Sequence, residues 1–499
     1  MPSPATANPL RFDNSYARDL QGHYALWQPE PAPAPRLLCL NRALADELGL
    51  DADMLASPDG IDLLAGNRLP PGAEPLAQAY AGHQFGHFSP QLGDGRALLI
   101  GELIDRHGQR RDLVLKGSGR TPFSRNGDGK YALGPALREY LIGEAMAAHG
   151  IPTSRALAVV ASGEQVWRQH ALPGAILTRV AASHIRIGTF EYLAAHHGPD
   201  SVRRLAKHVI ARHYPALHDA ANPWLELLRA VADRQAALVA RWLGVGFIHG
   251  VMNTDNMAIS GETIDYGPCA FIESYAPDAV FSSIDRDGRY AYGQQAEIAQ
   301  WNLARLAETL LPLIDTEQKR AVQAAIRVIE EFPGVHRGYW LSMMRDKLGL
   351  DTQGRADDDR QLADDWFALL QRRQLDFTNA FRHLYDAACA SGIERDQPPA
   401  SLAASDDNEF AAWWQRWRNR QMQRDEILLA RMCQANPWLI PRNHRVEAVL
   451  EAAQTGDLAP YNDLLERLRA PATEQPAATD DARPAPAAFT TTYRTFCGT

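Results

Sequence analysis

The sequence predicts an α+β fold with a β-rich N-terminal part that carries one main helix and a largely helical C-terminal part. Short apolar runs separated by glycine and proline fill much of residues 81–181, which is typical of strands joined by turns. A helical pattern over residues 134–150 interrupts these runs. From residue 190 onward, apolar residues recur every three or four positions, the spacing of helices that bury one face.

The composition is that of an ordinary globular protein. Of 499 residues, 45% are hydrophobic and 22% are charged, and this length corresponds to roughly two to four domains. The net charge of -9 argues against nucleic-acid binding, which needs a basic surface. No apolar run is long enough to cross a membrane, and the N-terminal residues lack a signal core. Five widely spread cysteines fit reduced thiols and give no zinc spacing. We therefore expect a cytoplasmic monomer with no nucleic-acid and no membrane partner.

The same patterns divide the chain into four segments. Residues 1–80 are expected to form an N-terminal extension, which contains proline-rich coil and a short helical pattern over residues 38–50. Residues 81–188 form the β-rich lobe and residues 189–469 the helical lobe. Residues 470–499 form a C-terminal tail.

A glycine pair lies near the start of the β-rich lobe. Gly93 and Gly95 flank Asp94, and Arg96 then leads into the apolar run 97–100. Glycine allows the backbone to approach a phosphate, and arginine pairs with one, so the stretch fits a nucleotide-binding loop. The same pattern is also typical of an ordinary tight turn.

Lys116 ends the next apolar strand, and a glycine-rich loop containing Asp128 and Gly129 follows it. Pro135 then opens the predicted helix, which carries Glu139. A strand lysine paired with a helix glutamate orients the lysine on the nucleotide phosphates in protein kinases. Taken singly, the two residues would be a lysine at a strand edge and a solvated glutamate.

Two further strands are predicted over residues 156–162 and 175–181. Arg179 lies in the second strand, and Arg186 follows seven residues later. Two arginines this close together suggest bidentate binding of an anion such as phosphate, whereas each alone would be read as a surface salt bridge.

The segment from Gly246 to Gly267 carries most of the chemistry. A loop ends in Asp255-Asn256, and two short runs, 257–259 and 263–265, are separated by a glycine-containing connection that predicts a β-hairpin. The hairpin would bring Asn256 and Asp265 together, and such oxygen ligands suit Mg²⁺ when it also holds phosphates.

The spacing in this segment is that of protein kinases. Kinases place an asparagine seven residues after the catalytic-loop histidine, with Asp-Phe-Gly beyond it, and here His249, Asn256 and Asp265-Tyr266-Gly267 keep that pattern. Val251 stands where kinases have their catalytic aspartate. The pattern therefore predicts a protein-kinase-like two-lobed fold that is either inactive or performs different chemistry, with Asp255 as the nearest carboxylate.

The rest of the chain is expected to be mainly helical. An irregular stretch after Gly267 lies where kinases have an activation segment. Trp413, Trp414 and Trp417 share one face of a predicted helix, which favours core packing over a binding site. Residues 470–486 are rich in proline, alanine and threonine and are expected to be disordered.

Together these motifs resemble the selenoprotein O family, protein adenylyltransferases with a kinase-like fold. The resemblance covers most of the chain and depends on QLGDGR, the Lys116 strand, the Gly-Asp-Gly loop, Glu139, HGVMNTDN, DYGP and a cysteine near the C-terminus. It implies that ATP binds inverted relative to kinases, with the γ-phosphate buried. AMP would then pass from ATP to Ser, Thr or Tyr hydroxyls of protein substrates with release of pyrophosphate, and with Mg²⁺, or Mn²⁺ in its place, as the metal.

The resemblance also implies a role for each matching residue. Asp255 would be the proton acceptor, Asn256 and Asp265 the metal ligands, and Glu139 the residue that orients Lys116. The nucleotide would be bound by Gly93, Gly95, Arg96, Lys116, Asp128, Gly129, Arg179, Arg186 and Asp265. Animal members carry selenocysteine where this chain has Cys497, and a redox bridge from Cys497 to Cys269 would hold the tail over the activation segment. Two unrelated thiols are the alternative in a reducing cytoplasm.

Two other functions fit parts of the pattern. One is a kinase-like phosphotransferase that uses the γ-phosphate, and the other is a nucleotide-binding pseudokinase that acts as a scaffold. Val251 counts against the first, because valine accepts no proton. Lys116, Asn256 and Asp265 count against the second, since a scaffold does not need a complete metal site. The protein substrates, and the use of UTP or another nucleotide, do not follow from the sequence.

Overall fold

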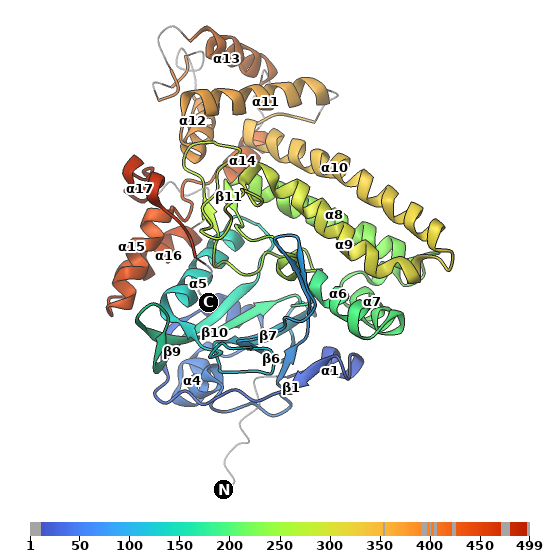
Figure 1. Ribbon diagram of the computed structural model, residues 1–499. Helices are drawn as coiled ribbons and strands as arrows, with labels where there is room; N and C mark the ends of the chain where they lie inside the picture. The colour runs from blue at the N-terminus through green and yellow to red at the C-terminus, as the bar shows by residue number, and fades with distance from the viewer. Residues whose placement is uncertain are drawn as a thin grey trace.

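One antiparallel sheet organises the N-terminal half of the protein (Figure 1). We describe it from a computed structural model, which describes residues 11–352, 355–390, 397–399, 401–403, 407–421, 426–470 and 480–496. The strands follow the order β1-β3-β6-β7-β10-β9-β2, and β8 pairs with β10. Their bounds are β1 Tyr24–Leu26, β2 Arg36–Leu40, β3 Leu76–Gln78, β6 Ala97–Ile104, β7 Arg110–Lys116, β8 Tyr131–Ala132, β9 Arg155–Trp167 and β10 Ala171–Ala181. With the helical half that follows, the sheet confirms the predicted α+β class.

The N-terminal extension takes part in this sheet. Strands β1 and β3 form one edge, and β2 pairs with β9 at the other. The helical pattern predicted over residues 38–50 was therefore wrong in its first residues, which belong to β2 because the backbone of β9 pairs with them. The helix itself is only Arg42–Glu47, and the Asn41 side chain caps it by accepting a hydrogen bond from the backbone of Leu44.

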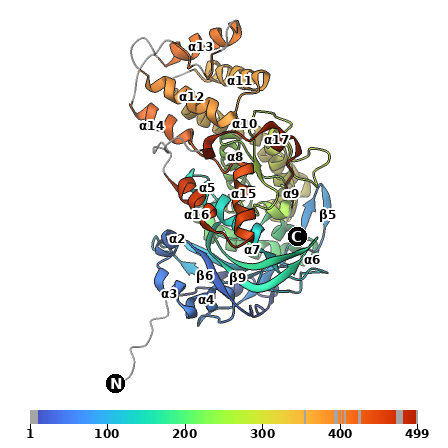
Figure 2. The same ribbon diagram turned by 90° about the vertical axis from the view of Figure 1, so that its left-hand side faces the viewer.

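Helices cover both faces of the sheet (Figure 2). On one face lie three short helices, α2 Arg42–Glu47, α3 Ala52–Ala56 and α4 Pro58–Ala65, whose leucines pack against Leu98, Leu115 and Ile176 of the strands. On the other lies α5, Leu133–Ala148, which begins two residues before the predicted Pro135. Thirteen of its 16 residues are buried, because the sheet covers one side and two C-terminal helices, α15 Asn443–Gln454 and α16 Ala459–Arg469, cover the other.

The C-terminal half is largely helical. Its helices are α6 Ile187–His196, α7 Pro199–His213, α8 Pro223–Gly244, α9 Gln295–Ile314, α10 Gln318–Leu348, α11 Ala356–Arg373, α12 Phe377–Cys389, α13 Asn408–Arg420, α14 Glu426–Ala435, α15 Asn443–Gln454, α16 Ala459–Arg469 and α17 Ala487–Thr492. The three long helices α8, α9 and α10 lie side by side (Figure 1). The structure buries Trp413, Trp414 and Trp417 in a hydrophobic core that is formed mainly by helices α10 to α14, which confirms their packing role.

The hairpin predicted between residues 257 and 265 was wrong. A turn is present, since Gly261 N donates to Ala258 O, but the two runs do not pair. Ala258 instead pairs with Arg186, and Thr263 pairs with Thr153. The backbone groups of the two runs are thus paired with the N-terminal half, which leaves them unavailable for pairing with each other. The strand before this segment, β11 Phe247–Ile248, pairs with β12 Ala270–Phe271.

The described part of the tail contacts the helical half. Asp480–Ala482 forms a 3-10 turn, and Arg467 pairs with Asp481 in it. Residues 471–479 lie outside those described, and disorder of the tail stays a prediction. Among the described residues, no helix is both long and apolar enough to cross a membrane.

Candidate active site

A buried ion pair forms at the end of β7. Lys116 is 5% exposed, and its Nζ lies 2.7 Å from Glu139 Oε2 and 2.8 Å from Asp265 Oδ1. Tyr131 Oη also donates to Glu139 Oε2, at 2.9 Å. The predicted lysine and glutamate are therefore in contact, and Asp265 from the C-terminal half joins them.

Two arginines complete a cationic ring around Asp265. Arg179 Nη1 lies 3.2 Å from both Glu139 Oε1 and Asp265 Oδ1, and Arg186 Nη1 lies 3.4 Å from Asp265 Oδ2. Burial alone would raise the pKa of Asp265, but Lys116 and the two arginines hold it well below its usual value. Asp265 has a backbone φ of 63°, a strained value for a residue other than glycine. Such strain at a charged cluster favours a functional role.

Asp255 lies beside this ring in a different environment. Its backbone carbonyl accepts a hydrogen bond of 2.8 Å from Arg186 Nη1. Its side chain is buried, and Oδ1 has no hydrogen-bond partner among the described residues. Burial raises the pKa of Asp255 to about 6, although Arg186 acts in the opposite direction. A carboxylate of this kind is suited to accept a proton near neutral pH.

A small hairpin, β4 Gly82–Gln84 and β5 His87–Ser89 (β5 is labelled in Figure 2), covers Asp255 through Gly82 and Gln84. A Cβ at Gly82 would lie 2.3 Å from Asp255 Oδ1, so only glycine fits there. Gln84 Nε2 lies 3.4 Å from Asp255 Oδ2. At the tip, Phe85 has a φ of 52°, and its N–H donates to Asn253 Oδ1 at 3.1 Å.

Asn256 and Asp265 are the candidate metal ligands. Asn256 Nδ2 donates to Val251 O at 2.9 Å, which orients the amide and leaves Oδ1 as the atom of the type that binds a hard cation. The Asp265 side chain is 25% exposed, in contrast to its nearly covered partner Glu139. One carboxylate and one amide fit Mg²⁺ when phosphate and water supply its other ligands. No group of three or more His, Cys, Asp or Glu side chains in the described residues could hold a metal by itself.

The predicted nucleotide-binding loop with Gly93 and Gly95 lies close to this cluster. Packing requires glycine at both positions. A Cβ at Gly93 would lie 2.5 Å from the Phe123 ring, and one at Gly95 would lie 2.9 Å from Phe123 O. Arg96 lies over the Tyr131 ring at 4.8 Å, and Lys116 lies at 4.9 Å from the same ring. Arg96 is therefore next to the cluster.

Asp128 and Gly129 lie in the loop after β7. Gly129 has a φ of 71°, and its carbonyl accepts a hydrogen bond from Gly119 N at 3.2 Å. Asp128 forms an ion pair with Arg168, with 2.8 Å between Oδ2 and Nη1. Because no described contact joins Asp128 to the ring around Asp265, its role in nucleotide binding stays a prediction.

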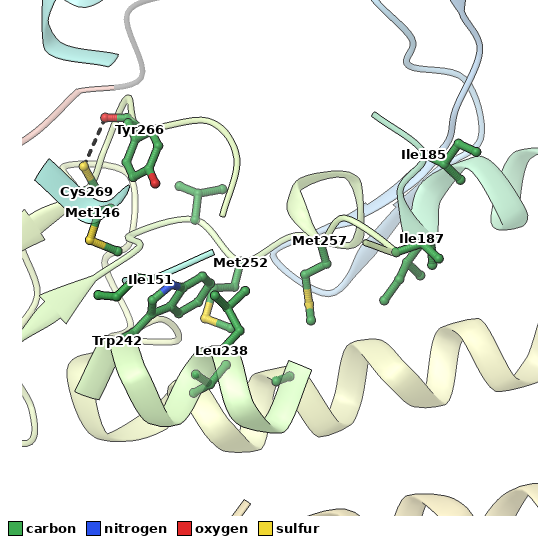
Figure 3. Close-up of a cluster of buried hydrophobic side chains, with 14 of the residues drawn as sticks. Met146, Ile151, Ile185, Ile187, Leu238, Trp242, Met252, Met257, Tyr266 and Cys269 are labelled. Carbon is green, nitrogen blue, oxygen red and sulfur yellow. Dashed lines mark hydrogen bonds between the residues drawn. The ribbon is translucent and has the colours of Figure 1, made fainter. Parts of the chain in front are cut away.

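Cys269 is fully buried in a hydrophobic core, near Met146 and Tyr266 (Figure 3). Its thiol donates to Tyr266 O at 3.2 Å, and burial raises its pKa to about 11 even though Arg138 lowers it. Cys497 lies outside the described residues. The chain shortly before it contacts the same region, since Thr495 Oγ1 donates to Pro268 O at 2.7 Å. A bridge between the two cysteines stays a prediction.

Sequence reasoning missed four residues of this site. Tyr131 bonds to Glu139, Gly82 and Gln84 cover Asp255, and Asp94 lies 3.9 Å from Arg186. Asp94 was visible between two glycines that were singled out. The other three carry no motif, and their roles come from contacts between distant parts of the chain.

Known proteins are similar to this chain along almost its whole length. The family model described as protein adenylyltransferase SelO matches residues 7–469. This chain belongs to the SelO family of protein adenylyltransferases. A protein nucleotidyltransferase YdiU of Cereibacter sphaeroides is 59% identical over 491 residues, which cover 98% of this chain and 100% of that protein. The YdiU proteins of Rhizobium rhizogenes and Chromobacterium violaceum are each 54% identical, over 99% and 95% of this chain and 98% of each relative.

Membership of the SelO family defines the class of reaction. The protein is a protein nucleotidyltransferase, which takes a nucleotide as one substrate and a protein as the other. This confirms the family predicted from the motifs and sets aside the two alternatives, a γ-phosphate phosphotransferase and a scaffold.

Proposed function

We propose that this SelO-family protein transfers AMP from ATP to Ser, Thr or Tyr hydroxyls of proteins, with Asp255 as the proton acceptor. The supporting observation is the contrast between two neighbouring carboxylates. Asp265 is surrounded by three cations, whereas Asp255 has an oxygen without a partner and a pKa raised to about 6. Neighbouring carboxylates with opposite pKa shifts are typical of divided roles in catalysis.

The chain supplies the proton transfer and the charge stabilisation. Asp255 takes the proton of the incoming hydroxyl, whose oxygen bonds to the α-phosphorus while the bond from that phosphorus to the β-phosphate oxygen breaks. Pyrophosphate leaves with the electron pair. Lys116, Arg179 and Arg186 provide three positive charges for the leaving group, and burial strengthens such interactions.

The three positive groups around Asp265 support the inverted binding of ATP, because they could hold the β- and γ-phosphates as they depart. Val251 is buried and offers no base, so chemistry at a γ-phosphate in the kinase position has no acceptor there. Moving the reacting phosphate toward Asp255 removes this difficulty. The sheet with α5, the Lys116 to Glu139 pair and the helical half also support a protein-kinase-like two-lobed fold.

Asn256 and Asp265 are the residues that would hold Mg²⁺. When bound, the ion would neutralise repulsion between the Asp265 carboxylate and the nucleotide phosphates. Lys116 and Arg179 both contact Asp265, so the ion would share this carboxylate with two cations.

Labelled ATP tests the proposal. With Mg²⁺ and α-casein as a general acceptor, label at the α-phosphate should enter the protein and label at the γ-phosphate should leave as pyrophosphate. Mass spectrometry should find AMP on hydroxyl side chains. Incorporation of γ-label with ADP as the product would contradict the inverted orientation.

A further inference from the structure

Arg179 forms a hydrogen bond with a buried histidine, His184, that the proposed chemistry does not use. His184 Nε2 lies 3.1 Å from Arg179 Nε, and His184 Nδ1 lies 3.0 Å from Asp112 Oδ2. Both His184 and Asp112 are 1% exposed. Asp112, His184 and Arg179 thus form a chain of hydrogen-bonded side chains, which ends at the carboxylates of Glu139 and Asp265.

The hydrogen bonds define the form of the imidazole. The Nε of arginine only donates, so His184 Nε2 must be the unprotonated nitrogen that accepts. The proton is then on Nδ1, which donates to Asp112. Asp112 is itself held in place, since its Oδ2 accepts the backbone N–H of His184 at 2.8 Å and its Oδ1 lies 2.6 Å from Arg212 Nη2.

The hydrogen bond at Arg179 Nε adds to the contacts that the Nη1 of the same side chain makes. Its Nη1 contacts Glu139 and Asp265, which belong to the cluster that nucleotide phosphates would enter. The Nε–H donates to His184 and to neither of these carboxylates, so this hydrogen bond holds the guanidinium independently of them. Since arginine has a long flexible side chain, a bond at Nε restricts both the position and the plane of the group.

We propose that His184 is a positioning residue for the transfer reaction, and that it acts by holding the Arg179 guanidinium in the orientation that binds the nucleotide phosphates. Asp112 supports it by keeping the proton on Nδ1. The inference rests on the proposed function, because the orientation of Arg179 matters for transfer only if Arg179 binds phosphate.

A pair of substitutions separates this role from simple core filling. In His184→Gln the amide oxygen can take the place of Nε2 and accept from Arg179, whereas in His184→Asn the shorter side chain reaches only the Nδ1 position and keeps the contact with Asp112. We expect His184→Asn to weaken ATP binding, measured by calorimetry with Mg²⁺, by about tenfold or more, and His184→Gln to retain most of it.

His208 provides a matched control. It is also a buried histidine bonded to an aspartate, with 2.9 Å between Nδ1 and Asp19 Oδ2, and it has no described contact with Arg179. His208→Asn should leave ATP affinity and the kcat for AMP transfer to α-casein unchanged, whatever it costs in thermal stability. Equal losses of ATP affinity in His184→Asn and His208→Asn would overturn the proposal.

The double variant that combines His184→Asn with Arg179→Ala tests whether His184 acts through Arg179. If His184 acts through Arg179, His184→Asn should cause no further loss of ATP affinity in Arg179→Ala, and an additive loss would overturn the proposal. A normal Arg179→Ala protein would instead show that the phosphate-binding role of Arg179 is wrong, which is a separate failure. If His184→Asn does not fold, Arg179→Lys offers a second route, because lysine keeps the positive charge but has no Nε–H for His184 to accept. Arg179→Lys should then weaken ATP binding similarly, and unchanged affinity would overturn the proposal.

Discussion

Asp255 and Asp265 are ten residues apart in one segment, yet the fold gives them opposite environments. Asp265 contacts Lys116, Arg179 and Arg186, and these cations hold its pKa well below its usual value. Asp255 is covered by a hairpin, and burial raises its pKa to about 6. The difference shows that two carboxylates of the same residue type acquire different chemistry from the charges that surround them.

The largest effect should come from Asp265→Ala. This variant removes the candidate metal ligand and leaves Lys116, Arg179 and Arg186 without their shared carboxylate, so we expect AMP transfer to be abolished. Transfer of α-labelled ATP to α-casein measures it, with thermal unfolding as the check that the protein folds. Near-normal activity with Mg²⁺ would remove Asp265 from the site.

Asp255→Asn should slow the chemical step by about a hundredfold to ten-thousandfold. ATP affinity should change little, because the proposed phosphate contacts are made by other residues. The amide removes a carboxylate whose ionisation in the folded state is unfavourable, so the variant should also be more stable at pH 7, by roughly 3 kcal/mol. Single-turnover kinetics and denaturant unfolding test both parts, and an active Asp255→Asn protein would exclude the proton-acceptor role.

Arg186→Ala and Arg179→Ala should each lower AMP transfer by about a hundredfold. The reason is the loss of positive charge next to the leaving pyrophosphate. A matched surface variant is Arg203→Ala, since Arg203 pairs only locally with Asp200 in the described contacts and both are well exposed. If all three substitutions have the same small effect, the cationic ring does not act on the leaving group.

The smallest effect concerns pH. Asp255 must be ionised to accept a proton, so kcat should be level above about pH 6 and fall about tenfold for each unit below it. The folded pKa lies above that of the unfolded chain, so the contribution of Asp255 to stability is present at low pH and is lost as pH rises from about 4 to 6. Asp255→Asn should abolish both dependences, and a kcat profile unchanged by this substitution would assign the titration to another group.

Much of the fold and of the site was predictable because it depends on short patterns. Lys116, Glu139, Arg179, Arg186 and Asp265 stand in motifs with characteristic spacing, and the structure brings all five together. The pairing of residues 257–265 was not predictable, because runs of three residues carry too little pattern to identify their partners. The contacts of Gly82 with Asp255 and of His184 with Arg179 join separate elements, so no short sequence pattern predicts them.

The β4–β5 hairpin has a consequence for a side reaction. Asp255 Oδ1 is out of reach of solvent, since the backbone of Gly82 lies against it. A water molecule that attacks the nucleotide, like an incoming protein hydroxyl, can therefore give its proton only to Oδ2 in this state. Hydrolysis of the nucleotide and its transfer to protein thus compete for one oxygen of Asp255, the oxygen that lies 3.4 Å from Gln84 Nε2.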